Sequence, residues 1–252
     1  MCSISPYFLR KYLLVAVLCL SAPLMATSAC ASVVITGTRV IYPGGTHEKT
    51  VQLDNQDAFP NVVQAWVDIN DPNSTPDNAD APFVVTPPLF RMEPKTGQSL
   101  RITFTGQGLP QDRESVFYLN VLQIPPLRDA DKSQNQLLVM LRNRLKLFYR
   151  PSGIAGKPED VAGQLHFSLR QQNGGWVVRV DNASGYYASL AKASLSAGGQ
   201  ELPLHADMVA PKSQATWALD KSAVLPAGAI SIHCQLISDY GAQVEIKQDV
   251  TR

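Results

Sequence analysis

The segment 135–151, NQLLVMLRNRLKLFYRP, gathers the residues of this chain whose types and spacing could do chemistry. Arg142, Arg144 and Lys146 occupy every second position in it. Side chains alternate along a strand, so these cations would share one face, where they could bind an anion or form a solvated basic stripe. Arg39 is a further cation that could converge on this face, although spacing alone does not show that convergence.

The first half of the same segment is apolar without interruption from 137 to 141. A strand of an antiparallel sandwich normally buries one face and exposes the other, which gives alternating apolar and polar residues. Here both faces of the expected strand are apolar, with Leu137, Val139 and Leu141 on one face and Leu138 and Met140 on the other. Both faces should therefore be buried against other residues. Two explanations stay open: a strand buried between two domains, or an edge strand that lends its second apolar face to another chain.

Sequence motifs of catalysis do not occur in the chain. It contains no phosphate loop, no G-x-S-x-G nucleophile elbow and no H-E-x-x-H zinc helix. His233 and Cys234 are adjacent, but neighbours in a strand project to opposite faces and could not act as a dyad. Cys234 is interpreted as a small buried hydrophobic residue. We therefore predict no enzymatic activity, no cofactor and no metal site.

The elements that would position these residues are short strands. Alternating segments recur about every ten residues between turn signals, and no stretch demands a helix. This pattern predicts an all-β fold of two β-sandwiches, because one sandwich takes about 100 residues. The expected domains are 32–152 and 153–252, since apolar density falls at that boundary. The expected strands are 33–42, 50–53, 62–69, 99–105, 116–124, 164–170 and 176–181, with a loop at 70–82 and a hairpin turn at Asn173-Gly174-Gly175.

The composition is that of a globular protein, with 252 residues, 45% hydrophobic and 17% charged, and a formal net charge of +1. This near-balance of charge argues against nucleic-acid binding. Arg10 and Lys11, the apolar run 12–20 and the small-residue site Ala29-Cys30-Ala31 predict a cleaved signal peptide over 1–31. The run is too short to span a bilayer, so we expect a periplasmic protein with no membrane insertion after cleavage.

Several separate motifs, in collinear order along nearly the whole mature chain, resemble the periplasmic pilus chaperones of the PapD-like family. The resemblance implies two immunoglobulin-like β-sandwich domains set at an angle around a cleft. The motifs are QAW at 64–66, TPP at 86–88, RMEP at 91–94, LPQDRESVFYLN at 109–120, IPP at 124–126, LKLFYRP at 145–151, Asn182 with Tyr186-Tyr187, and DYG at 239–241.

The resemblance also implies what the protein binds. Members of this family hold newly exported pilus (fimbrial) subunits, each an incomplete sandwich lacking one strand, and deliver them to an outer-membrane usher. The chaperone completes the subunit with its own last first-domain strand, whose matching residues here are Leu137, Val139 and Leu141. An arginine and a lysine anchor the subunit's C-terminal carboxylate, and these match Arg39 and Lys146. Charge-assisted hydrogen bonds from two cations suit that role.

A third set implied by the resemblance is Arg101, Glu114 and Asp239, which would hold an ionic contact between the domains. The chain departs from some members in having no disulfide in the second domain, because Cys234 would be the only cysteine left after cleavage. The short segment between Pro126 and Leu137 resembles the short-loop branch of the family, which mostly serves rod-like adhesive pili.

Two functions from different classes stay open on the sequence. One is an assembly chaperone, and the other is a two-domain periplasmic binding or adhesin module for a glycan or a receptor. The apolar run discriminates between them, because an adhesin does not need it exposed beside a cationic cleft. A hydrolase would require a convergent nucleophile and base, which the sequence does not show. The roles of Arg142 and Arg144, and self-association of the subunit-free protein, are also left open.

Overall fold

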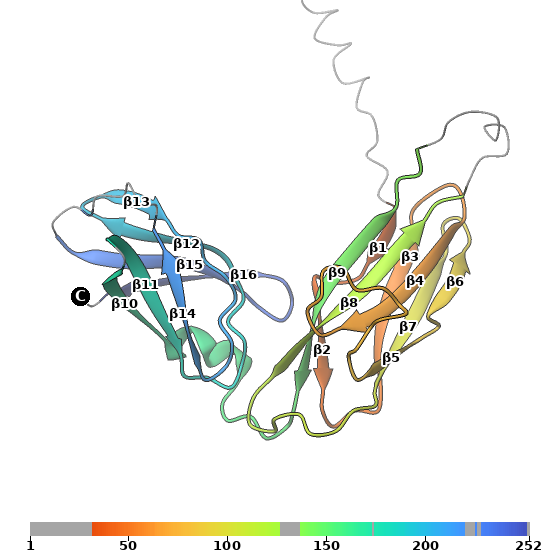
Figure 1. Cartoon of the computed structure of the whole chain (residues 1–252), viewed down its shortest axis with the longest axis horizontal. Helices are drawn as coiled ribbons and strands as arrows, with labels where there is room; N and C mark the ends of the chain where they lie inside the picture. Colours follow the sequence, from red (N-terminus) through yellow and green to blue (C-terminus); the bar gives the residue numbers. More distant parts are fainter. Residues whose placement is uncertain (1–31, 127–136, 173, 220–224, 226–227, 251–252) are drawn as a thin grey trace, which may run out of the picture. The chain divides into compact units, whose positions relative to one another are not determined.

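The computed structural model describes residues 32–126, 137–172, 174–219, 225 and 228–250. These residues form strands, turns and loops, with one short 3₁₀ helix, η3 (Pro158–Gln164) (Figure 1). The all-β prediction is confirmed. The expected signal peptide at 1–31 and the segment 127–136 lie outside the described residues. Within the described residues, no helix has the length and apolar character needed to cross a membrane.

Two sheets form the first sandwich. Their strand orders are β1-β3-β7-β5 and β2-β9-β8-β4-β6. In chain order the strands are β1 (Val33–Ile35), β2 (Arg39–Pro43), β3 (Lys49–Asn55), β4 (Asn61–Asp68), β5 (Phe83–Thr86), β6 (Leu89–Met92), β7 (Gly97–Phe104), β8 (Ser115–Ile124) and β9 (Leu141–Arg150).

The core of the first sandwich lies between these two sheets. Leu100 and Ile102 of β7 are fully buried, whereas Arg101 between them is exposed. Leu147 of β9 and Leu119 of β8 enter the same cluster from the other sheet. Period-two alternation therefore gives each strand one core face and one outer face, and on β9 the even-numbered residues occupy the outer face.

The prediction of one continuous strand over 33–42 is wrong, because the structure has two strands there. Ile35 of β1 pairs with Leu53 in one sheet, and Arg39 of β2 pairs in parallel with Lys146 in the other. Between them Gly37 has φ +94°, a backbone conformation that other residues rarely adopt. This bend moves the chain from one sheet to the other and places Arg39 beside Lys146.

The second sandwich has its own core, which includes Trp217, Val178, Leu195 and Ile232. Its sheets have the orders β10-β11-β14 and β13-β12-β15-β16. The expected hairpin joins β10 to β11, with Gly174 at φ +78° and Asn173 outside the described residues. In chain order the strands are β10 (Leu165–Gln172), β11 (Gly175–Asn182), β12 (Leu190–Ala197), β13 (Gln200–Pro203), β14 (Ser213–Ala218), β15 (Ile230–Ile237) and β16 (Gln243–Asp249).

The predicted domain boundary after Ser152 falls in the connection between β9 and η3, and it stays a prediction. The other expected strands correspond to β3, β4, β7, β8, β10 and β11, and the expected loop 70–82 contains no strand.

Candidate functional site

The apolar strip 137–141 is uncovered in the structure. The exposed fractions are 90% for Leu137, 69% for Val139 and 49% for Leu141, and Leu138 and Met140 are 41% and 51% exposed. A strand buried between two domains would hide these side chains, so that explanation is wrong. The strip instead offers apolar side chains that another chain could bury.

The strand that follows the strip has an open edge. On one side β9 pairs antiparallel with β8, from Leu141 opposite Gln123 to Tyr149 opposite Ser115. On the other side it pairs with β2 only from Lys146 onward. Among the described residues, no strand pairs with 141–145 on that side. The backbone N–H and C=O groups of this half-edge are therefore available to an added strand.

Arg39 and Lys146 are directly opposite each other where the open edge ends. One Arg39 Nη donates to the carbonyl oxygen of Ile237 at 3.1 Å, and the guanidinium lies 5.8 Å from the ring centroid of Phe148. The Arg39 Nε is buried without a hydrogen-bond partner. Within the described chain, neither Arg39 nor Lys146 forms an ion pair. Two half-buried cations thus lie side by side, and no carboxylate of the described residues forms an ion pair with either of them.

The electrostatics of this pair favour an anionic ligand. Burial lowers the pKa of Lys146 below its ordinary value; the charge of Asp207 opposes this effect, and the charge of Arg39 adds to it. Burial also lowers the pKa of Arg39, against the opposing charges of Asp239 and Glu114. A carboxylate placed between the two cations would compensate for the cost of their desolvation and offset their mutual repulsion.

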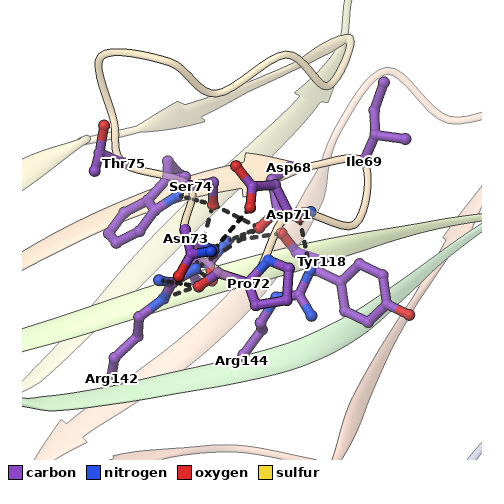
Figure 2. A network of polar contacts seen from close by, with 12 residues as sticks. Asp68, Ile69, Asp71, Pro72, Asn73, Ser74, Thr75, Tyr118, Arg142 and Arg144 are labelled. Carbon is purple, nitrogen blue, oxygen red and sulfur yellow. Dashed lines mark hydrogen bonds and ion pairs between the residues drawn. The ribbon is translucent and has the colours of Figure 1, made fainter.

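Arg142 and Arg144 share the outer face of β9 with Lys146, as their spacing predicted, but they are not a solvated stripe. Arg144 forms an ion pair with the fully buried Asp68, with 2.7 Å between Nη2 and Oδ1. Arg142 donates to the Asn120 side-chain oxygen at 2.6 and 2.9 Å and to the Pro72 carbonyl at 2.9 Å. Figure 2 shows both arginines turned into this network under the loop that follows β4. The two arginines are therefore already occupied.

Glu114 and Asp239, which the resemblance places in an ionic contact with Arg101, both pair with Arg150 in the structure. Arg150 Nε lies 2.7 Å from Glu114 Oε1, and its two terminal nitrogens lie 2.7 and 2.9 Å from the Asp239 carboxylate. Arg101 is on the exposed face of β7, between Thr50 and Thr86 on the neighbouring strands. The signal that could have identified Arg150 is its place in the series 142, 144, 146 and 150 on one face of β9.

Glu114 is held by both of its carboxylate oxygens, because the Tyr187 N–H donates to the second one at 2.8 Å. Burial raises the pKa of Glu114, and Arg150 and the Tyr187 N–H limit that rise. Burial by itself lowers the pKa of Arg150, but Asp239 and Glu114 outweigh it and raise that pKa well above its ordinary value. The arginine therefore stays charged and joins residues that are 36 and 89 positions away in the sequence.

We expect Glu114→Ala to destabilise the protein. It leaves the Tyr187 N–H without its acceptor and removes one of the two carboxylates from Arg150, which costs about 3 kcal/mol for a buried pair. The melting temperature should fall by roughly 6–12 °C for a chain of this size. Arg101→Ala is the control and should change the free energy of unfolding by less than about 0.5 kcal/mol. Thermal unfolding followed by circular dichroism decides this, and an equal loss in the Arg101 variant would contradict the assignment to Arg150.

His233 and Cys234 project to opposite faces of β15, as expected. Cys234 is buried, and burial raises the pKa of its thiol to about 12, so it is not a reactive thiolate. The His233 ring lies 3.2 Å from Glu201 and 3.3 Å from the Ser231 hydroxyl. β15 is paired with β12 and β16 on both edges, so its backbone N–H groups are used in the sheet and offer no oxyanion hole. In the described part of the chain, no three His, Cys, Asp or Glu side chains are grouped to hold a metal.

Comparison with known proteins identifies the family of this chain. Residues 32–155 match the family described as "Pili and flagellar-assembly chaperone, PapD N-terminal domain", and residues 160–248 match "Pili assembly chaperone PapD, C-terminal domain". The chaperone protein FimB/FhaD of Bordetella pertussis is 42% identical over 221 residues, which cover 86% of this chain and 87% of that protein.

Solved structures are similar in the same way. The crystal structure of the YadV chaperone is 34% identical, with a TM-score of 0.74 over 87% of this chain and 100% of that one. The structure of the Salmonella enterica SafA pilin in complex with the SafB chaperone gives 29% identity and a TM-score of 0.70, over 89% of this chain and 99% of that chain. Two immunoglobulin-like β domains and a non-enzymatic chaperone role follow from these matches, and the chain belongs to the PapD-like family of pilus assembly chaperones.

Proposed function

We propose that this protein is a periplasmic chaperone that binds pilus subunits by donating a strand. Residues 137–145 would complete the subunit's unfinished sandwich, and Arg39 and Lys146 would anchor its C-terminal carboxylate. The observation that carries the proposal is the pair of unmatched cations at the end of an open strand edge, next to an uncovered apolar strip. The SafB chaperone, a relative of this chain, has been solved with a pilin bound.

The direction of the bound strand follows from the position of the two cations. β2 occupies the edge of β9 from Lys146 onward, so an added strand can extend only from Lys146 back toward Leu137. If its C-terminal carboxylate lies at Lys146, the strand must run parallel to β9, as β2 does. Its backbone would pair with β9, while Leu137, Val139 and Leu141 would fill the subunit's groove.

Both contacts should contribute to the binding free energy. Burying three aliphatic side chains is worth roughly 1.5–3 kcal/mol each in transfer terms, before the cost of association is subtracted. The charge-assisted hydrogen bonds that a lysine and an arginine donate to a carboxylate contribute more interaction energy in a dehydrated site than in water. The strip supplies affinity, and the cations fix where the strand ends.

The remaining parts of the proposal concern the protein's surroundings. Segment 1–31 would direct export and be removed, which leaves domains 32–152 and 153–252 in the periplasm. The donated strand belongs to the first of these domains. The chaperone would then deliver the subunit to an outer-membrane usher, where the subunit exchanges this strand for one of better fit.

The test is co-purification from the periplasm with a pilin of the same organism, either intact or lacking its last few residues. We expect a soluble complex with the intact pilin and a large loss of complex with the truncated one, because the truncated chain cannot place its carboxylate at Lys146. Equal yields would refute carboxylate anchoring. No complex with any of several pilins would refute the chaperone function and favour a binding module.

A further inference from the structure

A strand that binds along β9 could align with it in more than one register. Arg142, Arg144, Lys146 and Arg150 all lie on the outer face of β9 at even spacings. Any of these cations could attract a carboxylate by charge alone. The incoming strand is itself part of the proposed function, so a residue that sets its register has that role only if the proposed function holds.

The apolar strip cannot exclude every wrong register. A slip of one residue would turn the apolar side chains of the donated strand away from the groove, so it is rejected. A slip of two residues, about 7 Å, keeps every side chain on its correct face. The carboxylate would then lie at Arg144 instead of Lys146. A slip in the other direction is blocked by β2, which pairs with β9 up to Arg150.

We propose that Asp68 sets the register of the bound subunit by neutralising Arg144. Asp68 is the last residue of β4 and is fully buried, and its Oδ1 lies 2.7 Å from Arg144 Nη2. The Arg144 guanidinium lies 3.7 Å from the centroid of the Tyr118 ring, which covers it further. Among the described cations on this face, Lys146 forms no ion pair, and neither does Arg39 opposite it on β2.

Asp68 is built to remain ionised. Its Oδ2 accepts hydrogen bonds from the side chains of Asn120 at 2.6 Å and Ser74 at 2.9 Å, and its Oδ1 accepts from the Asp71 N–H at 3.0 Å (Figure 2). Burial by itself raises the pKa of Asp68, but the bonds from Arg144, Asn120 and Ser74 outweigh burial and lower it below the ordinary value. The Asp68 carboxylate therefore stays charged near neutral pH and competes with the subunit's C-terminal carboxylate for Arg144.

Arg142 is occupied mainly by neutral groups. Its nearest Asp68 oxygen is 3.9 Å away, whereas Asn120, Pro72 and Ser74 accept its hydrogen bonds at 2.6–3.2 Å. Arg144 depends more on Asp68, because its guanidinium donates to that carboxylate and its buried Nε has no hydrogen-bond partner. Loss of the Asp68 charge would thus release Arg144 in particular, and Arg144 is the cation that corresponds to the two-residue slip.

The test measures register by disulfide cross-linking. A chaperone carrying Val139→Cys is co-expressed with a pilin that has single cysteines along its last strand, and the cross-linked positions are identified by mass spectrometry. Cys234 is buried and does not compete. With Asp68 present we expect one main cross-linked position. With Asp68→Asn we expect a second position, two residues nearer the pilin's C-terminus, because the whole strand moves toward Leu137.

The matched control is Asp68→Asn/Arg144→Gln, which removes both charges and leaves no unpaired buried arginine. It should restore the single register. Wild-type register in Asp68→Asn alone would overturn the proposal, as would a second register that persists in the double variant, because Arg144 could not then be its cause. The absence of any cross-link when Asp68 is intact would refute strand donation instead, so the two failures are distinguishable.

A second measurement keeps Asp68 unchanged and removes Lys146, alone and together with Arg144. In a Lys146→Ala chaperone, an Arg144 that is already neutralised cannot take over the carboxylate. Lys146→Ala and Lys146→Ala/Arg144→Gln should therefore show the same residual capture. If Lys146→Ala still captured the pilin in the shifted register, and adding Arg144→Gln abolished that capture, the role given to Asp68 would be refuted.

Discussion

Lys146→Ala should weaken subunit capture by roughly 30-fold to several thousand-fold. Removing one partner of a buried, hydrogen-bonded charge pair costs about 2–5 kcal/mol, and each 1.4 kcal/mol is tenfold in affinity. The loss should appear as a smaller yield of soluble chaperone–pilin complex and as a higher dissociation constant for purified components.

The same substitution should not destabilise the subunit-free chaperone. Lys146 is half-buried beside Arg39 and forms no ion pair with the described residues, so its removal relieves repulsion and desolvation. We expect an unchanged or higher melting temperature, as is usual where a binding residue is held at a cost to stability. Lys192→Ala, at an exposed strand position, is the control and should change neither property. A clear fall in the melting temperature of Lys146→Ala would mean that the lysine has a structural partner.

The features that strand geometry determines locally could be predicted from the sequence. The spacing of Arg142, Arg144 and Lys146 predicted a common face, and the uninterrupted run 137–141 predicted a second apolar face. Both features depend only on the alternation of side chains along a strand. The exposure of the run was not determined by this pattern, because a buried strand has the same composition.

The partners of the charged residues could not be predicted in the same way. Asp68 is 76 residues from Arg144 in the sequence, and Asp239 is 89 residues from Arg150. Spacing shows which face a cation occupies, but the opposing carboxylate is brought there by the pairing of distant strands. For this reason the ionic contact was predicted at Arg101, although Arg150 forms it.

The position of Arg39 beside Lys146 could not be predicted from the residue spacing either. Its parallel pairing with Lys146 depends on the bend at Gly37, where the chain leaves one sheet and enters the other. A continuous alternating pattern over 33–42 gives no sign of that change. The resemblance to the chaperone family supplied the pairing of these two cations, and the strand register gives its physical basis.

Val139→Asp should abolish strand donation while leaving the chaperone folded. The Val139 side chain is 69% exposed in the subunit-free protein, so a charge there should change the free energy of unfolding by less than about 0.5 kcal/mol. In the complex the same carboxylate would enter an apolar groove without a partner, which costs at least several kcal/mol. The pilin should then aggregate or be degraded, and little of it should remain in the soluble periplasmic fraction.

Two matched variants separate donation from a general effect of charge. Val84→Asp places the same substitution on a half-exposed position of β5, in the other sheet of the first sandwich, and should leave capture intact. Met140→Asp lies one residue from Val139, on the alternate face of the strip, and should weaken capture less than Val139→Asp does. Wild-type capture by Val139→Asp would exclude strand donation, and equal losses at 139 and 140 would show that the strip binds as a surface without alternation. A loss at 139 that exceeds the loss at 140, with none at 84, is the result that only an inserted strand explains.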